Sequence, residues 1–293
     1  MEQNAPTRKA TGRRDAIAPD GRRRRALITG ASAGIGAALA QRFADRGFDL
    51  TLTARRRDKL DAVAATIAAR TGRDIAIIPQ DLAEPEASER LFAATEGAGV
   101  AIDALICNAG YGIRGRYVET EWRRLRDQLQ VLVTGLAELN HRFLPAMEER
   151  RYGRILNVAS LAGFFPGSPT GTLYTPAKSF VIKLSEGLHL EYEDANVHVC
   201  ALCPGLTRSE FHAVLGAEEM VNSVPRFLWM DADEVAVQGF DAVMAGRPVA
   251  VTGGANRALA FLSRHAPSGL LYAGLRRNGD WGRRLSLSAK GNP

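Results

Sequence analysis

The chain of 293 residues has few cysteines and no long apolar run. Its three cysteines, Cys107, Cys200 and Cys203, are too few for a disulfide-rich domain, so we expect reduced thiols and a cytoplasmic location. No apolar stretch approaches the roughly 20 residues that a membrane-spanning helix needs, and the polar N-terminus lacks the apolar core of a secretory signal. Hydrophobic residues make up 46% of the chain, enough for one large domain.

Metal-binding patterns are also scarce. Cys200 and Cys203 form a single C-x-x-C pair without a second pair, and the histidines show no ligand spacing. We interpret Cys200 as a small strand residue and Cys203 as the residue before Pro204, and we expect no metal. Only His212, in the expected substrate loop, is a weak candidate for substrate contact.

The net charge of +6 is unevenly distributed. Residues 1–25 hold eight basic and three acidic residues, residues 257–293 hold seven and one, and residues 26–256 have a net charge of −5. A nucleic-acid-binding protein carries its basic residues on a folded face, so this distribution argues against nucleic acid as a partner. Residues 1–24 lack apolar periodicity, which predicts a disordered basic tail whose removal leaves folding intact.

From residue 26 onward, short apolar runs alternate with helical patterns. The strand candidates are residues 26–29, 49–53, 75–79, 102–107, 155–158, 197–202 and 249–251, and the helical stretches lie around 35–47, 58–70, 86–97, 119–149, 174–194 and 232–245. This alternation predicts a single doubly wound α/β domain of the Rossmann type over residues 25–252, with about seven parallel strands and helices on both faces. Residues 253–293 would form an extension with short helices. Ligands of such sheets bind at the carboxyl ends of the strands.

A glycine-rich turn, T-G-A-S-A-G-I-G from Thr29, joins the first strand to a helix. Glycines permit a tight turn, and the helix N-terminus offers N–H groups to a pyrophosphate. The spacing differs from G-x-G-x-x-G, and no Lys-Ser/Thr follows as in a Walker A loop. The expected cofactor contacts in this turn are Gly30, Ser32, Ala33, Gly34, Ile35 and Gly36.

Three arginines follow the second strand after Ala54. A site for NAD usually has an acidic residue here for the ribose 2′-hydroxyl, whereas arginine suits the 2′-phosphate of NADP. No acid precedes Asp58. The pattern therefore favours NADP(H), with Arg55 as the first contact and Arg56 as the next, over a merely solvated arginine cluster.

Tyr174 and Lys178 lie four residues apart at the start of a helical stretch, so their side chains share one face. A free tyrosine has a pKa of about 10, but a neighbouring ammonium group and a positive nicotinamide would stabilise its phenolate. Ser160, just after the strand at 155–158, can hydrogen-bond a substrate oxygen. Y-x-x-x-K alone is weak evidence, and its position after a serine at a strand end gives it weight.

With these residues the chain resembles the short-chain dehydrogenase/reductase family over about residues 24–252. The resemblance rests on residues 29–36, Asp81-Leu82, Asn108-Ala109-Gly110, Ser160, Tyr174 with Lys178, and Pro204-Gly205 with Thr207. It implies that Tyr174 is the general acid/base, that Lys178 binds the nicotinamide ribose and lowers the tyrosine pKa, and that Ser160 orients the substrate.

The resemblance also implies cofactor contacts at other strand ends. Asp81 would contact the adenine, the turn at 108–110 would brace the sheet, and the segment from Pro204 would close over the nicotinamide. The expected contacts beyond the glycine turn are Arg55, Arg56, Asp81, Leu82, Asn108, Ala109, Gly110, Tyr174, Lys178, Pro204, Gly205 and Thr207. The implied function is carbonyl/alcohol oxidoreduction with NADP(H), in the direction of reduction, by a homodimer or homotetramer.

Two departures from the family pattern matter. Leu132 stands where many members have an asparagine that holds a water relaying protons to the lysine. Ser160 precedes Tyr174 by fourteen residues, one more than is usual, and we expect the loop at 166–172 to absorb the extra residue. A catalytically silent NADP-binding or scaffold protein of the same fold is therefore the alternative to an enzyme.

Two apolar segments can each be interpreted in two ways. Residues 206–230 would form a lid over a lipophilic substrate, or pack on the sheet edge or a partner subunit. Residues 259–277 contain apolar residues and three arginines, and would contact anionic lipid weakly at a membrane surface or dock on the domain or a subunit. For the second segment, docking is favoured.

Overall fold

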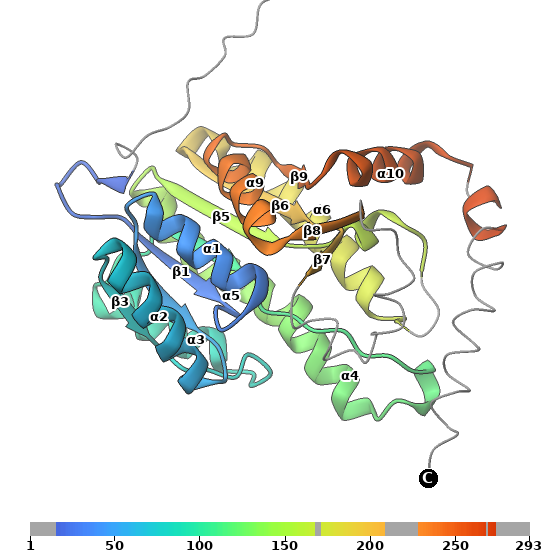
Figure 1. Cartoon of the computed structure of the whole chain (residues 1–293), viewed down its shortest axis with the longest axis horizontal. Helices are drawn as coiled ribbons and strands as arrows, with labels where there is room; N and C mark the ends of the chain where they lie inside the picture. The colour runs from blue at the N-terminus through green and yellow to red at the C-terminus, as the bar shows by residue number, and fades with distance from the viewer. Residues whose placement is uncertain (1–15, 168–170, 209–227, 268, 274–293) are drawn as a thin grey trace, which may run out of the picture.

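The computed structural model describes residues 16–167, 171–208, 228–267 and 269–273. Its centre is a sheet of seven parallel strands in the order β3-β2-β1-β4-β5-β6-β9 (Figure 1). The strands are β1 (Arg25–Thr29), β2 (Asp49–Thr53), β3 (Ile75–Ile77), β4 (Ala104–Cys107), β5 (Gly153–Val158), β6 (Val197–Cys203) and β9 (Val249–Val251). The predicted doubly wound parallel α/β sheet is confirmed.

Helices cover both faces of the sheet. They are α1 (Gly34–Asp45), α2 (Arg57–Thr71), α3 (Ala87–Ala93), α4 (Trp122–Leu129), α5 (Gly135–Glu149), α6 (Tyr174–Tyr192), α9 (Ala232–Met244) and α10 (Gly254–His265). Buried side chains of α1, α2 and α9 form one core cluster with the sheet, and those of α3, α5 and α6 form another. Strands β4 and β5 are buried along their whole length, as expected of strands covered on both faces.

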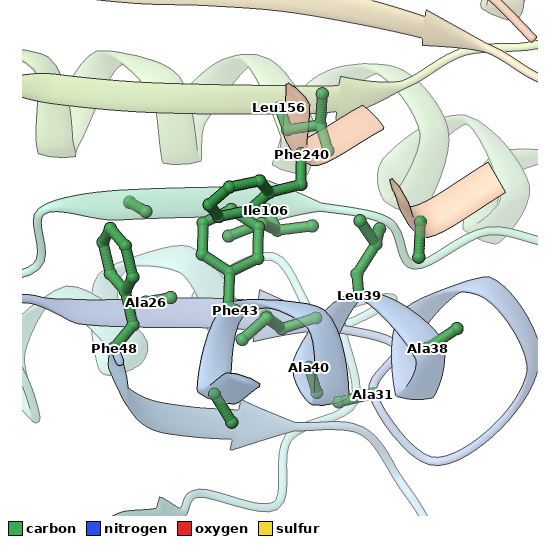
Figure 2. Packing of buried hydrophobic residues seen from close by; sticks show 14 of the residues in the cluster. Ala26, Ala31, Ala38, Leu39, Ala40, Phe43, Phe48, Ile106, Leu156 and Phe240 are labelled. Carbon is green, nitrogen blue, oxygen red and sulfur yellow. The ribbon is translucent and has the colours of Figure 1, made fainter. Parts of the chain in front are cut away.

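Aromatic rings fill the core between α1, α9 and the sheet. Phe43 of α1 contacts Phe240 of α9 edge to face, with ring centroids 4.8 Å apart, and contacts Phe48 at 5.3 Å (Figure 2). Edge-to-face pairs add to the stabilisation that burial alone gives. They pack α1 against α9 and against the residue just before β2.

The helical stretch expected around residues 119–149 runs from Trp122 to Glu149, but it is not regular throughout. Helices α4 and α5 are joined by one turn of π-helix, Gln130–Thr134, which contains Leu132. A π-turn inserts one extra residue into the helical ladder and is often found beside functional sites. Apolar periodicity over so short a stretch does not reveal a shift of one residue.

Two short strands were not expected. β7 (Leu206–Arg208) pairs in parallel with β8 (Trp229–Asp231), and an ion pair of 2.9 Å joins Arg208 to Asp231. The pairing brings together both ends of the apolar segment 206–230. Residues 209–227, including His212, lie outside the described residues.

The last nine residues of the basic tail, 16–24, differ from the disorder expected of them. A bridge between Ile17 and Arg23 closes a small hairpin, and Ala16 and Ala18 are buried. The guanidinium of Arg22 binds both carboxylate oxygens of the buried Asp103, at 2.7 and 2.8 Å. This segment is an arm against the sheet, whereas residues 1–15 lie outside the described residues.

Candidate functional site

The glycine turn leads into the N-terminus of α1, where no side chain of the described residues accepts a hydrogen bond from the first backbone N–H groups of the helix. Gly30 and Gly34 have positive φ angles of 65° and 56°, which glycine adopts without strain. A Cβ on Gly36 would lie 2.2 Å from the Gly30 carbonyl oxygen, so only glycine permits this approach. Within the described chain, no side chain caps α1 and no acidic residue occupies its first turn. Such an N-terminus suits a phosphate group.

Asn108 holds the glycine turn against the end of β4. Its Nδ2 donates to the carbonyl oxygens of Thr29 and Gly30, at 3.0 and 3.2 Å. In return, the Thr29 hydroxyl oxygen accepts from the backbone N–H groups of Asn108 and Ala109, at 2.9 and 3.0 Å. Four hydrogen bonds thus join the ends of β1 and β4.

A cavity of about 780 Å³ opens at the carboxyl ends of the strands. It is lined by Ser160 and by all the expected cofactor contacts except Gly36, which permits close packing of the turn, while the weak candidate His212 lies outside the described residues. These residues are Gly30, Ser32, Ala33, Gly34, Ile35, Arg55, Arg56, Asp81, Leu82, Asn108, Ala109, Gly110, Ser160, Tyr174, Lys178, Pro204, Gly205 and Thr207. The topology therefore brings together segments far apart in sequence.

The sequence did not single out several residues that line the same cavity. Tyr111 and Asp127 border it between β4 and α4, while Leu161, Phe165 and Leu206 add apolar surface near Ser160. Phe165 lies in the loop before α6, where spacing gave no signal. Tyr111 directly follows the Asn108–Gly110 turn, so its position after a strand end is the signal that could have found it.

The arginines after β2 lie at the cavity's edge. Arg55 and Arg56 are exposed and line the cavity, and the Arg56 guanidinium donates to the Ser32 hydroxyl at 3.2 Å. Arg57 instead starts α2 and pairs with Asp61 at 3.5 Å. Two of the three arginines thus face the same space as the glycine turn.

Ser160 and Tyr174 are in contact despite the thirteen residues between them. Ser160 follows β5, its Oγ accepts from the Ala162 N–H at 3.1 Å, and it hydrogen-bonds the Tyr174 hydroxyl. Burial raises the pKa of Tyr174, and the bond to Ser160 opposes that rise. The phenol therefore carries its proton at neutral pH. The loop expected to absorb the extra residue includes residues 168–170, which lie outside the described residues.

Lys178 lies one helical turn from Tyr174 and is buried. Its Nζ donates to the Val158 carbonyl at 2.7 Å and lies 5.6 Å from the centroid of the Tyr174 ring. Burial lowers the pKa of Lys178 to about 8. The side chain is therefore mostly protonated at neutral pH, but it can lose its proton near working pH.

Leu132 packs beside these groups. It is 1% exposed, and a Cβ placed on Gly110 would lie 2.9 Å from its Cδ2 and 3.7 Å from Lys178 Nζ. Apolar side-chain atoms thus fill the space next to Gly110, close to the lysine. A leucine side chain cannot hold a relay water by a hydrogen bond.

The cysteines do not form part of this chemistry. All three are free and buried, and burial raises the pKa of Cys107 and of Cys200 to about 12. Among the residues that the structure describes, no group of three or more His, Cys, Asp and Glu side chains is placed to hold a metal ion. No described helix combines the length and apolar character that crossing a bilayer requires.

Fold and site together define a class: a doubly wound α/β protein with a phosphate-binding turn facing a serine, a tyrosine and a lysine. The model of one family, described as short chain dehydrogenase, matches residues 24–220. The chain belongs to the short-chain dehydrogenase/reductase family, and it is an oxidoreductase that transfers hydride between NAD(P) and an alcohol or carbonyl group.

Three relatives illustrate the range of similarity. The 7beta-hydroxysteroid dehydrogenase of Clostridium sardiniense is 30% identical over 62% of this chain and 68% of its own length. A short-chain dehydrogenase from Sphingobium yanoikuyae in complex with NADPH is 31% identical, with a TM-score of 0.73 over 81% of this chain and 92% of that chain. The bulky-bulky ketone specific alcohol dehydrogenase from Comamonas testosteroni is 26% identical, with a TM-score of 0.67 over 92% and 95%.

Proposed function

We propose that this protein is an NADP(H)-dependent reductase of bulky, lipophilic carbonyl compounds, with Tyr174 as the proton donor. The observation that carries the proposal is the convergence of Ser160, Tyr174 and Lys178 on a cavity that Arg55 and the glycine turn also line. The relatives support the substrate class, since one is a hydroxysteroid dehydrogenase and another is specific for bulky-bulky ketones.

The residues at the site fit a dinucleotide. The start of α1 offers backbone N–H groups to a pyrophosphate, and the cavity extends from there to Tyr174. Arg55 and Arg56 favour NADP(H), because guanidinium groups bind a phosphate by charge-assisted hydrogen bonds and no acid occupies position 54. NADPH in the relative from Sphingobium yanoikuyae agrees with this preference.

Ser160, Tyr174 and Lys178 each have a different role in the transfer of the proton. The bound nicotinamide supplies the hydride. The Ser160 hydroxyl donates a hydrogen bond to the substrate carbonyl oxygen and so orients the carbonyl towards Tyr174. The Tyr174 hydroxyl gives its proton to that oxygen, and the ammonium of Lys178 stabilises the phenolate that remains. The apolar side chains of Leu161, Phe165 and Leu206 exclude water and contact the substrate.

Cofactor titration tests the preference directly. We expect NADPH to bind at least tenfold more tightly than NADH, since a charge-assisted hydrogen bond contributes about 1.5–3 kcal/mol. Arg55→Ala should remove most of this difference, whereas the control Arg57→Ala should preserve it, because Arg57 pairs with Asp61. Equal affinities in the wild type, or an unchanged preference in Arg55→Ala, would defeat the assignment to NADP.

A panel of carbonyl compounds tests the substrate class. We expect kcat/KM with NADPH to rise from short aliphatic ketones to steroid-sized ketones, because each buried CH₂ group contributes about 0.8 kcal/mol. A preference for the short ketones would contradict the lipophilic assignment.

A catalytically silent protein is the second candidate, and Leu132 is the observation that favours it. Leu132 is buried beside Gly110, near Lys178, and its side chain offers no hydrogen bond to a relay water. NADPH binding without turnover of any compound in the panel would support the silent protein over the reductase.

A further inference from the structure

Helix α10 buries small or polar residues and leaves large apolar side chains exposed. Its buried residues, Asn256, Ala260 and Ser263, share one side of the helix and are small or polar. Its outward side carries Phe261 and Leu262, with exposed fractions of 62% and 59%, whereas Leu259, at 36%, lies at the border of the buried side. A surface helix normally turns its apolar stripe inward, so the sequence of α10 suits a second apolar environment outside the domain.

Polar contacts fix α10 in this orientation. Asn256 Nδ2 donates to the Thr252 carbonyl at 2.9 Å, and the Ser263 hydroxyl donates to the Phe164 carbonyl. The Arg264 guanidinium lies 4.5 Å from the centroid of the Phe164 ring. The two contacts with Phe164 anchor one side of α10 to the turn that follows Ser160, at the edge of the molecule beyond β9 (Figure 1).

The apolar strip continues past the helix and is accompanied by positive charge. Leu270 and Tyr272 are 69% and 52% exposed. Arg257 is exposed on α10, whereas Arg264, on the side that packs against Phe164, pairs with Glu186 at 3.5 Å. Over residues 257–293 the sequence has seven basic residues and one acidic residue, whereas residues 26–256 are net acidic. Positive charge is thus concentrated in the same part of the chain as the outward apolar strip.

We propose that the outward face of α10, with Leu270 and Tyr272, binds the surface of an anionic lipid bilayer. Phe261 and Leu262 would enter the boundary between head groups and acyl chains, and Arg257, one helical turn before Phe261, would contact the anionic head groups. A second copy of this chain fits less well, because a two-fold contact through this face would bring two basic segments together. The proposal does not depend on the substrate or on activity.

Co-sedimentation of the full chain with vesicles tests the proposal. We expect binding to phosphatidylglycerol vesicles, little binding to phosphatidylcholine vesicles, and weaker binding at about 1 M NaCl, where the Debye length falls to about 3 Å. The double variant Phe261→Ser/Leu262→Ser should bind phosphatidylglycerol vesicles at least about tenfold more weakly. The matched control is Leu190→Ser on α6, which removes an apolar side chain that is 72% exposed, and it should bind like the wild type.

Melting temperature and NADPH affinity check that the double variant is folded, since neither altered residue lines the cavity. Absence of vesicle binding by the wild type, or equal binding by the folded double variant, would overturn the proposal. So would a concentration-dependent oligomer that the double variant abolishes without any vesicle binding, because the face would then be an interface between copies. If the lipid proposal fails in any of these ways, the proposed reductase function still stands, because cofactor binding and turnover are measured separately.

Discussion

The ammonium group of Lys178 is buried at the carboxyl end of β5, where the Val158 carbonyl accepts its hydrogen bond. Burial costs free energy for the charged form and lowers the pKa from 10.5 to about 8. Below pH 8 the lysine is charged in both the folded and the unfolded chain, so the full cost of burial is present. Between about pH 8 and 10.5 the folded chain has released a proton that the unfolded chain retains, so this cost is relieved as the pH rises.

Lys178→Met should therefore stabilise the fold at pH 7 by about 2 kcal/mol, after allowance for the lost hydrogen bond. The gain should shrink towards pH 10. Urea unfolding at both pH values measures it, and Lys183→Met, at an exposed lysine of the same helix, is the control with no expected change. A methionine variant less stable than the wild type at pH 7 would contradict this account of Lys178.

Leu132→Asn tests whether the site lacks a proton relay. The leucine is 1% exposed, so an amide there is buried and costs about 1–3 kcal/mol of stability if it finds no partner. We expect a lower melting temperature with no rise in kcat and no shift of the pH profile. A higher kcat or a shifted profile would show instead that a relay water is useful and that the leucine limits the enzyme.

At the scale of elements, the arm at residues 16–24 is attached chiefly through Arg22. Arg22 binds Asp103, which is 2% exposed and whose oxygen also accepts from the Arg25 N–H at 2.9 Å. Arg22→Ala leaves a buried carboxylate without its guanidinium, so we expect a loss of about 2–4 kcal/mol in the free energy of unfolding. The neighbouring Arg23 is exposed, and Arg23→Ala should change stability by less than about 0.5 kcal/mol.

Truncation separates the two parts of the tail. Removing residues 1–15 should leave the melting temperature unchanged, whereas removing residues 1–24 should lower it, because the arm buries Ala16 and Ala18. Equal melting temperatures for both truncations would show that the arm contributes nothing. The apolar pattern of the tail is too sparse to have predicted this arm, which is held by two buried alanines, by Arg22 on a buried aspartate and by the buried Arg24, whose guanidinium lies 3.5 Å from the centroid of the Tyr152 ring.

The sequence predicted the strands of the central sheet better than it predicted this arm. Strands such as β4 and β5 consist of short aliphatic runs because both of their faces are buried, and runs of that kind are visible without a structure. The π-turn at Gln130–Thr134 and the pairing of β7 with β8 were not visible. The former depends on a shift of one residue in a ladder, and the latter on contact between segments more than twenty residues apart.

At the scale of the whole molecule, the candidate site could be predicted largely because parallel strands end at one edge. Ser160, Asn108 and the glycine turn each follow a strand, so a sheet of this topology brings them together. Tyr111 and Phe165 were missed because a lone aromatic in a loop has no pattern. Gly36 does not line the cavity; it lies against the Gly30 carbonyl, where the absence of a side chain permits the turn.

The central claim is that Tyr174 donates the proton in an NADPH-dependent reduction. Its most direct test is turnover of a bulky ketone by Tyr174→Phe, with NADPH binding measured by fluorescence on the same sample. The variant keeps the ring and loses the proton, so NADPH affinity should stay within about twofold while kcat falls by a factor of about a hundred or more. NADPH binding with undiminished turnover in Tyr174→Phe would contradict the account.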